Sequence, residues 1–117
     1  MTQKEHDVKV TNFIRISNEI VNLYNTKNKD YDDSFGKTFR KLGIISAITR
    51  MGDKMNRFEA LGLKVDRILK GGGTEQERVN LVADESIVDT LKDIAAYAIM
   101  TIIELEDDEQ RSQISST

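Results

Sequence analysis

The chain has 117 residues, of which 38% are hydrophobic and 32% are charged, and its formal net charge is −3. This composition predicts one soluble globular domain with a modest core, without the strongly basic balance that signals DNA or RNA binding. The absence of cysteine and the presence of one histidine, His6, exclude disulfides, thiolate zinc sites and cysteine nucleophiles, and argue against a histidine-centred site. Any metal would be a hard cation held by carboxylates, such as magnesium or manganese.

No segment reaches the length of a membrane span, and the first residues lack the apolar stretch of a signal peptide. We therefore expect no membrane partner and a cytoplasmic location, in the host cytoplasm if a phage encodes the chain. No internal repeat and no second domain is visible. We expect a single helical domain over residues 1–106 and a disordered acidic and polar tail over residues 107–117.

The first predicted helix covers residues 8–25, where apolar side chains such as Phe13, Ile16 and Ile20 recur at helical spacing. Residues 26–37 are polar, rich in Asn, Asp, Ser and Gly, and without helical period, which predicts a loop.

That predicted loop carries two aromatic residues, Tyr31 and Phe35, together with lysines that include Lys29 and Lys37. A lysine-rich segment with exposed rings can hold a phosphorylated base, because the ring stacks on the base while the ammonium groups meet the phosphate. The alternative is that the two rings only attach the loop to the bundle.

A second helix is predicted over residues 44–61 and is expected to end at Gly62 as a C-cap. Arg50, Lys54 and Arg57 fall within about 60° of one another on its surface. Three like charges on one face repel unless an anion compensates them, so this face is a candidate phosphate site. The alternatives are a solvated basic face or ion pairs with an acidic helix.

Residues 63–70 predict a short helix, and the glycines at 71–73 open a flexible connection to residue 77. The last helix, residues 84–105, carries Glu85, Asp89 and Asp93 at a spacing of four residues and is apolar almost all round further on. Such a helix must be buried on most faces. We therefore expect an all-α bundle of about four main helices that forms a homodimer or a higher oligomer with the site near an interface.

Three segments resemble the phage and bacterial nucleotide-modification-associated domain family, whose activity is unknown, over roughly residues 10–105. The matching segments are Lys27-Asn28-Lys29-Asp30-Tyr31-Asp32-Asp33-Ser34-Phe35, Arg50-x-x-x-Lys54-x-x-Arg57, and Glu85-Ser86-Ile87-Val88-Asp89-Thr90-Leu91-Lys92-Asp93-Ile94-Ala95-Ala96-Tyr97-Ala98.

A weaker resemblance is to the all-α nucleoside-triphosphate pyrophosphohydrolases of the MazG and dimeric dUTPase type, which bind magnesium through Glu-x-x-Glu on one helix and Glu-x-x-Asp on a later one. It implies that Glu85 and Asp89 are metal ligands and that Asp53 comes from the first motif. Arg50 stands where that motif has its first glutamate, which should weaken metal binding and favour direct phosphate contact.

Two functions of different class follow. One is a magnesium-dependent nucleotide pyrophosphohydrolase, with Asp53, Glu85 and Asp89 on the metal. The other is a phage-type protein that binds a nucleotide or cyclic-nucleotide signal without cleaving it. In both, the nucleotide-binding residues are Lys29, Tyr31, Phe35, Lys37, Arg50, Lys54 and Arg57. A helical interaction protein, whose charged stripes only pair with each other, is the third alternative.

Overall fold

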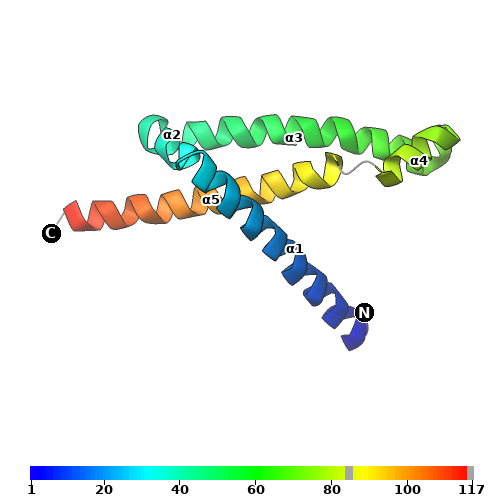
Figure 1. Ribbon diagram of the computed structural model, residues 1–117, viewed down its shortest axis with the longest axis horizontal. Coiled ribbons are helices and arrows are strands. Elements are labelled where there is room, and N and C mark those ends of the chain that lie inside the picture. The colour runs from blue at the N-terminus through cyan, green and yellow to red at the C-terminus, as the bar shows by residue number, and fades with distance from the viewer. Residues whose placement is uncertain (84–85, 116–117) are drawn as a thin grey trace.

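The computed structural model describes residues 1–83 and 86–115, and within these ranges the chain forms helices and no strand (Figure 1). The all-α prediction is therefore confirmed. The elements in chain order are α1 (Gln3–Asp30), α2 (Ser34–Leu42), α3 (Ile44–Arg67), the π-helical segment η1 (Ile68–Gly72), α4 (Glu75–Ala83) and α5 (Ser86–Ser115).

Helices α3 and α5 lie side by side along the length of the molecule and form its main packing contact (Figure 1). They run antiparallel, because Arg57 Nε donates a hydrogen bond to Thr90 Oγ1 (3.2 Å) while the earlier Lys54 pairs with the later Asp93 (3.0 Å). Both links are polar. The interior between the two long helices is thus held by specific polar contacts as well as by apolar packing.

Helix α1 begins with a capping box, in which the Glu5 amide donates to the Thr2 hydroxyl (3.1 Å) and the Thr2 amide donates to the Glu5 carboxylate (3.2 Å). The helix then continues to Asp30, and α2 begins at Ser34. The prediction of a loop over residues 26–37 is therefore wrong at both ends. Only three residues separate α1 from α2. The chain turns there because Asp32 and Asp33 adopt left-handed conformations (φ 50° and 56°), which Asp tolerates better than most side chains.

Helix α3 passes through Gly62 instead of ending there, so the predicted C-cap is wrong. The helical path ends at Gly71, whose positive φ of 85° is a conformation that glycine adopts without steric cost. The expected flexible connection over residues 71–77 is a defined turn: the hydroxyl of Thr74 accepts from the Glu77 amide (3.1 Å), and Arg67 pairs with Glu77 (2.7 Å). These contacts start α4 within two residues of η1.

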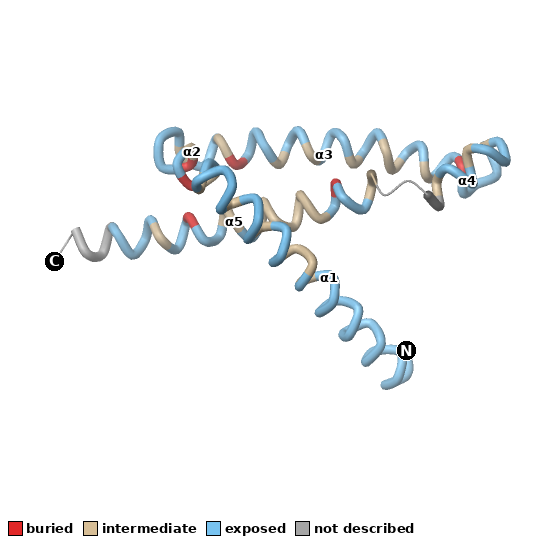
Figure 2. Tube along the Cα trace, in the orientation of Figure 1, coloured by how far each residue is buried: buried red, intermediate tan, exposed pale blue. Residues whose placement is uncertain are grey.

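Apolar burial within one chain is small. Among the described residues the buried hydrophobic side chains are Phe39, Ala47 and Ile68. The molecule measures 63 × 36 × 26 Å, and α1 projects from the α3–α5 pair with its first half exposed to solvent (Figure 2). The functional groups must therefore be sought where α1, α3 and α5 meet.

Helix α5 continues through the acidic run to Ser115, although the sequence predicted that the last helix would end at residue 105. The Arg111–Asp107 ion pair (2.8 Å) lies one turn apart on this stretch and offsets part of its negative charge. The division into a domain over residues 1–106 and a separate tail stays a prediction. Of the helices in the described part of the chain, none is both long enough and apolar enough to cross a bilayer.

Candidate functional site

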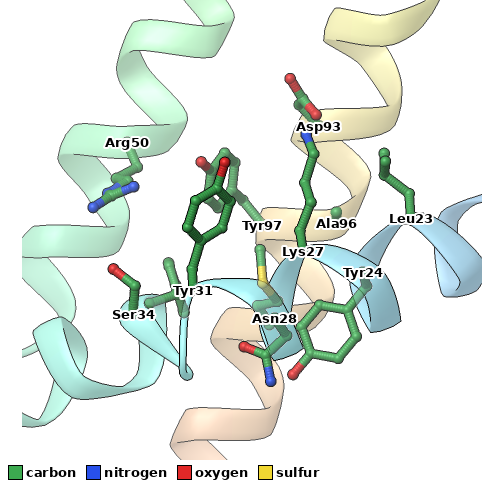
Figure 3. Close-up of a pocket in the computed structure, with 12 residues that line it drawn as sticks. Leu23, Tyr24, Lys27, Asn28, Tyr31, Ser34, Arg50, Asp93, Ala96 and Tyr97 are labelled. Atoms are coloured by element: carbon green, nitrogen blue, oxygen red, sulfur yellow. The ribbon is translucent and has the colours of Figure 1, made fainter.

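A pocket of about 340 Å³ lies where the end of α1 and the start of α2 meet the α3–α5 pair (Figure 3). Seven of its twelve lining residues are aromatic or aliphatic. They are Leu23, Tyr24, Tyr31, Phe35, Ala96, Tyr97 and Met100. The Phe35 and Tyr97 rings lie 5.7 Å apart between centroids at a tilt of 40°, within the range of favourable ring pairs.

The polar members of the pocket come from all four surrounding elements. They are Lys27, Asn28, Ser34, Arg50 and Asp93. Figure 3 shows the Arg50 guanidinium on the α3 side and the Lys27 side chain extending from α1 in the direction of Asp93. The pocket therefore combines ring faces with cationic groups within the space of one small molecule.

Two cations of the pocket have no carboxylate partner among the residues that the structure describes. Within the described ranges, no ion pair is formed by Arg50 or Lys27, whereas Lys54 is paired with Asp93. Because Asp93 is neutralised by Lys54, the lining is left with positive charge that no described acid compensates. An anionic ligand would supply the missing countercharge.

A network of ion pairs near the pocket residue Tyr24 fixes the turn between α1 and α2. Arg40 pairs with Asp33 (3.3 Å) and with the buried carboxylate of Glu104 (3.4 Å), which joins this turn to α5. Burial, and then the negative charges of Asp33 and Glu104, raise the pKa of Tyr24 above its usual value near 10. The Tyr24 hydroxyl therefore stays protonated at neutral pH and can donate a hydrogen bond.

The structure distributes the predicted nucleotide-binding residues unevenly. Tyr31, Phe35 and Arg50 line the pocket, and Lys54 lies beside it through its ion pair with Asp93. The other three lie outside the lining. Lys29 is exposed, Lys37 pairs with Asp32, and Arg57 donates to Thr90.

The predicted metal ligands are not gathered in the described part of the chain. Asp53 and Asp89 are exposed, and Glu85 lies outside the described residues. Within residues 1–83 and 86–115, no three acidic or histidine side chains come together in a way that would hold a metal ion. The described donors therefore do not fit a magnesium centre, and magnesium stays a prediction.

Several pocket residues escaped assignment from the sequence. Tyr24 falls within the first predicted helix, residues 8–25, and Lys27 and Asn28 fall within the predicted loop, residues 26–37. Tyr97 lies four residues after Asp93, so both point from α5 to the same side. A polar pair at that spacing within an otherwise apolar helix was the available signal.

One family model matches the chain over a range that includes most of the pocket residues. A family model described as nucleotide modification associated domain 1 matches residues 27–105, a range that holds ten of the twelve pocket residues, all but Leu23 and Tyr24. No curated protein and no solved structure matches the chain significantly. The resemblance to the MazG and dimeric dUTPase type stays a prediction. Because the match spans well over half of its length, the chain belongs to the nucleotide modification associated domain 1 family.

Proposed function

We propose that the pocket between α1, α3 and α5 binds a phosphorylated nucleotide. The observation that carries the proposal is the pair of cations, Arg50 and Lys27, that line an aromatic pocket without a described carboxylate partner. A ligand that fits must present negative charge to one part of the pocket and a flat ring to another. Nucleotides combine both features in a molecule of suitable size.

The phosphate end is assigned to Arg50 and Lys27. A guanidinium presents a planar fork of donors that binds phosphate oxygens in pairs, and an ammonium adds a compact charge beside it. Lys54 lies one helical turn after Arg50 on α3, within reach of the same region, where it holds Asp93 in place.

The base end is assigned to the aromatic residues. Tyr31 is 68% exposed, so its ring face is available, and it is one of the residues that line the pocket (Figure 3). Stacking of a base on such a ring contributes about 1–3 kcal/mol and tolerates different bases. Asn28 and Ser34 supply neutral hydrogen-bonding groups for the sugar or the base edge.

Binding without cleavage is the form of this function that we favour. Asp93, the acid within the pocket, is engaged by Lys54, and an ammonium partner competes with a metal for a carboxylate. Magnesium-dependent hydrolysis is the second candidate. It is supported by the sequence pattern of Asp53, Glu85 and Asp89, of which Glu85 lies outside the described residues.

Equilibrium dialysis against nucleoside mono-, di- and triphosphates and cyclic dinucleotides, with magnesium or with EDTA, tests the proposal. Mass spectrometry of the recovered ligand separates the two candidates. We expect binding that survives EDTA and a ligand that is recovered intact. A cleaved product formed only with magnesium would favour the pyrophosphohydrolase, and no binding across the panel would overturn the nucleotide function.

A matched pair of variants locates the site. Arg50→Ala should weaken binding at least tenfold, which corresponds to about 1.4 kcal/mol. Lys41→Ala removes one exposed cation of α2 that does not line the pocket, so it should leave the dissociation constant unchanged. Equal losses in both variants would mean that bulk charge, not the pocket, attracts the ligand.

A further inference from the structure

Helix α5 presents a polar stripe to the rest of the chain, flanked by half-buried apolar side chains such as Ile94 and Met100. The inner stripe, which faces the rest of the chain, consists of Thr90, Asp93, Tyr97, Thr101 and Glu104, and these side chains are buried or half-buried. Four of the five can ionise or form hydrogen bonds through short polar groups, and the fifth is a tyrosine. At about 100° per residue they fall within about 80° of one another.

The opposite side of α5 is apolar and faces solvent. This outer stripe consists of Val88, Leu91, Ala95, Ile99 and Ile102, whose four large members are exposed. These five residues, separated by steps of three or four, also span about 80°, and their centre lies about 160° from that of the inner stripe. A soluble protein does not leave such a stripe uncovered without a partner.

The first half of α1 is a second uncovered apolar element. Ile20 and Tyr24 are half-buried against the body, and the same side of the helix continues toward the N-terminus as Val10, Phe13 and Ile16. All residues of this α1 arm, residues 3–16, are exposed, and Phe13 is 75% exposed. The apolar side of α1 therefore continues into the arm, beyond the part of the helix that packs on α5 (Figure 2).

The amount of exposed surface is too large for a chain that works alone. The solvent-accessible surface is 8945 Å², whereas a compact monomer of 13.3 kDa exposes about 6,500 Å². The radius of gyration is 18.4 Å, against about 13 Å for a compact domain of this length. The excess of roughly 2,400 Å² compares with the roughly 1,000–2,500 Å² that each partner buries in an obligate homodimer.

We propose that a second copy of this chain covers both elements, with the α1 arm of each protomer lying on the outer stripe of the partner's α5. The arm and the outer stripe each extend about 20 Å along their helices, so their lengths match. A two-fold axis makes the contact twice, because each copy offers one arm and one stripe. One symmetric assembly therefore satisfies both unpartnered surfaces, which a single unrelated helix would not.

Sedimentation equilibrium of the full chain gives the first test. We expect a mass of twice 13.3 kDa for the wild type. Phe13→Asp and Ile99→Asp each place a charge in both copies of the contact, so each should weaken dimerisation at least a hundredfold. Asn18→Asp adds the same charge to α1 about 140° from Phe13 and should leave the mass unchanged. A wild-type mass of 13.3 kDa, or a dimer indifferent to both stripe variants, would overturn the proposal.

Mixing the two variants tests the arrangement itself. When Phe13→Asp and Ile99→Asp chains with different tags are co-expressed, one of the two contacts joins an unaltered arm to an unaltered stripe. We expect the mixed dimer to co-purify although neither variant pairs with itself. Arm-to-arm or stripe-to-stripe packing would leave no intact contact in the mixture, so failure of the two chains to associate would overturn the α1-on-α5 arrangement. The readout holds even if each variant is unfolded when expressed alone, since the mixture restores an unaltered contact.

Discussion

The ammonium group of Lys54 lies 3.0 Å from a carboxylate oxygen of Asp93, and this ion pair joins α3 to α5 at the edge of the pocket. The Lys54 side chain is 31% exposed and the Asp93 side chain is 25% exposed, so solvent screens their interaction only in part. The pair holds the two helices in register and also sets the charge of the pocket, because it cancels the acid within the lining.

Replacing Lys54 and replacing Asp93 should change nucleotide affinity in opposite directions. Lys54→Ala leaves Asp93 unpaired beside the phosphate and should weaken binding about tenfold, whereas Asp93→Asn removes that negative charge and should strengthen binding by up to about tenfold, each corresponding to roughly 1.4 kcal/mol. Titration calorimetry with the tightest nucleotide of the panel measures both. Asp89→Asn, one turn earlier and exposed, is the control. A magnesium-dependent loss of affinity in Asp93→Asn would show instead that this acid is a metal ligand.

The exposed ring of Tyr31 should contribute through its face and not through its hydroxyl. Tyr31→Leu removes the stacking surface and should cost about 1–3 kcal/mol of binding free energy. Tyr31→Phe keeps the ring and should bind almost as well as the wild type. Because the side chain is exposed, neither change should alter the urea midpoint of unfolding. If the two variants lose affinity equally, the hydroxyl makes the contact and the stacking assignment is wrong.

Two glycines give a matched test of the Arg40 network at the turn between α1 and α2. A Cβ at Gly36 would lie 2.5 Å from Asp33 Oδ2 and 2.6 Å from Glu104 Oε1, so Gly36→Ala must displace two carboxylates that Arg40 holds. We expect a loss of about 1–3 kcal/mol in the free energy of unfolding. A Cβ at Gly52 would meet nothing within 4 Å, so Gly52→Ala should stabilise α3 by about 1 kcal/mol. Urea unfolding of both variants should show opposite signs, and matching signs would contradict the crowding at Gly36.

Attachment of α1 to α5 should depend on pH through Glu19. Its hydrogen bond from Lys92 is the main cause that lowers the pKa of Glu19 below its usual value of 4.5. A carboxyl whose folded pKa is depressed stabilises the fold above its unfolded pKa, and this contribution disappears as pH falls through the folded pKa. Glu19→Gln should therefore melt below the wild type at neutral pH, and the two melting temperatures should converge well below pH 4.5. A difference in melting temperature that stays constant across that pH range would exclude the Glu19 carboxylate as the source of the pH-dependent stability.

The sequence predicted the long helices well because apolar spacing over many residues is a strong signal. It failed at Gly62, since a glycine inside a helix looks the same in sequence as one that ends it, and of Gly62 and Gly71 only the latter adopts a positive φ. It also failed at the α1–α2 junction. The turn there depends on two left-handed aspartates and on Glu104, which is far away in the chain.

The candidate site could be predicted only in part for the same reason. Arg50, Lys54 and Arg57 share one face of α3, which the spacing made visible. Their partners lie on α5 and α1, so the sequence could not show that Lys54 meets Asp93, that Arg57 meets Thr90, and that Arg50 is left facing the pocket. The separation of one basic face into three roles is a property of the packed helices.

The opposed stripes of α5 also limit how this helix can change in length. Each added residue rotates everything after it by about 100°, so one insertion between Asp93 and Ile99 would carry Ile99 and Ile102 out of the outer stripe and leave Glu104 facing away from Arg40. Exchanges of side chains on one stripe leave the other intact, whereas a single inserted or deleted residue disturbs both. Under the two proposals above, ligand preference and assembly would vary independently by substitution, while the length of this segment would stay fixed.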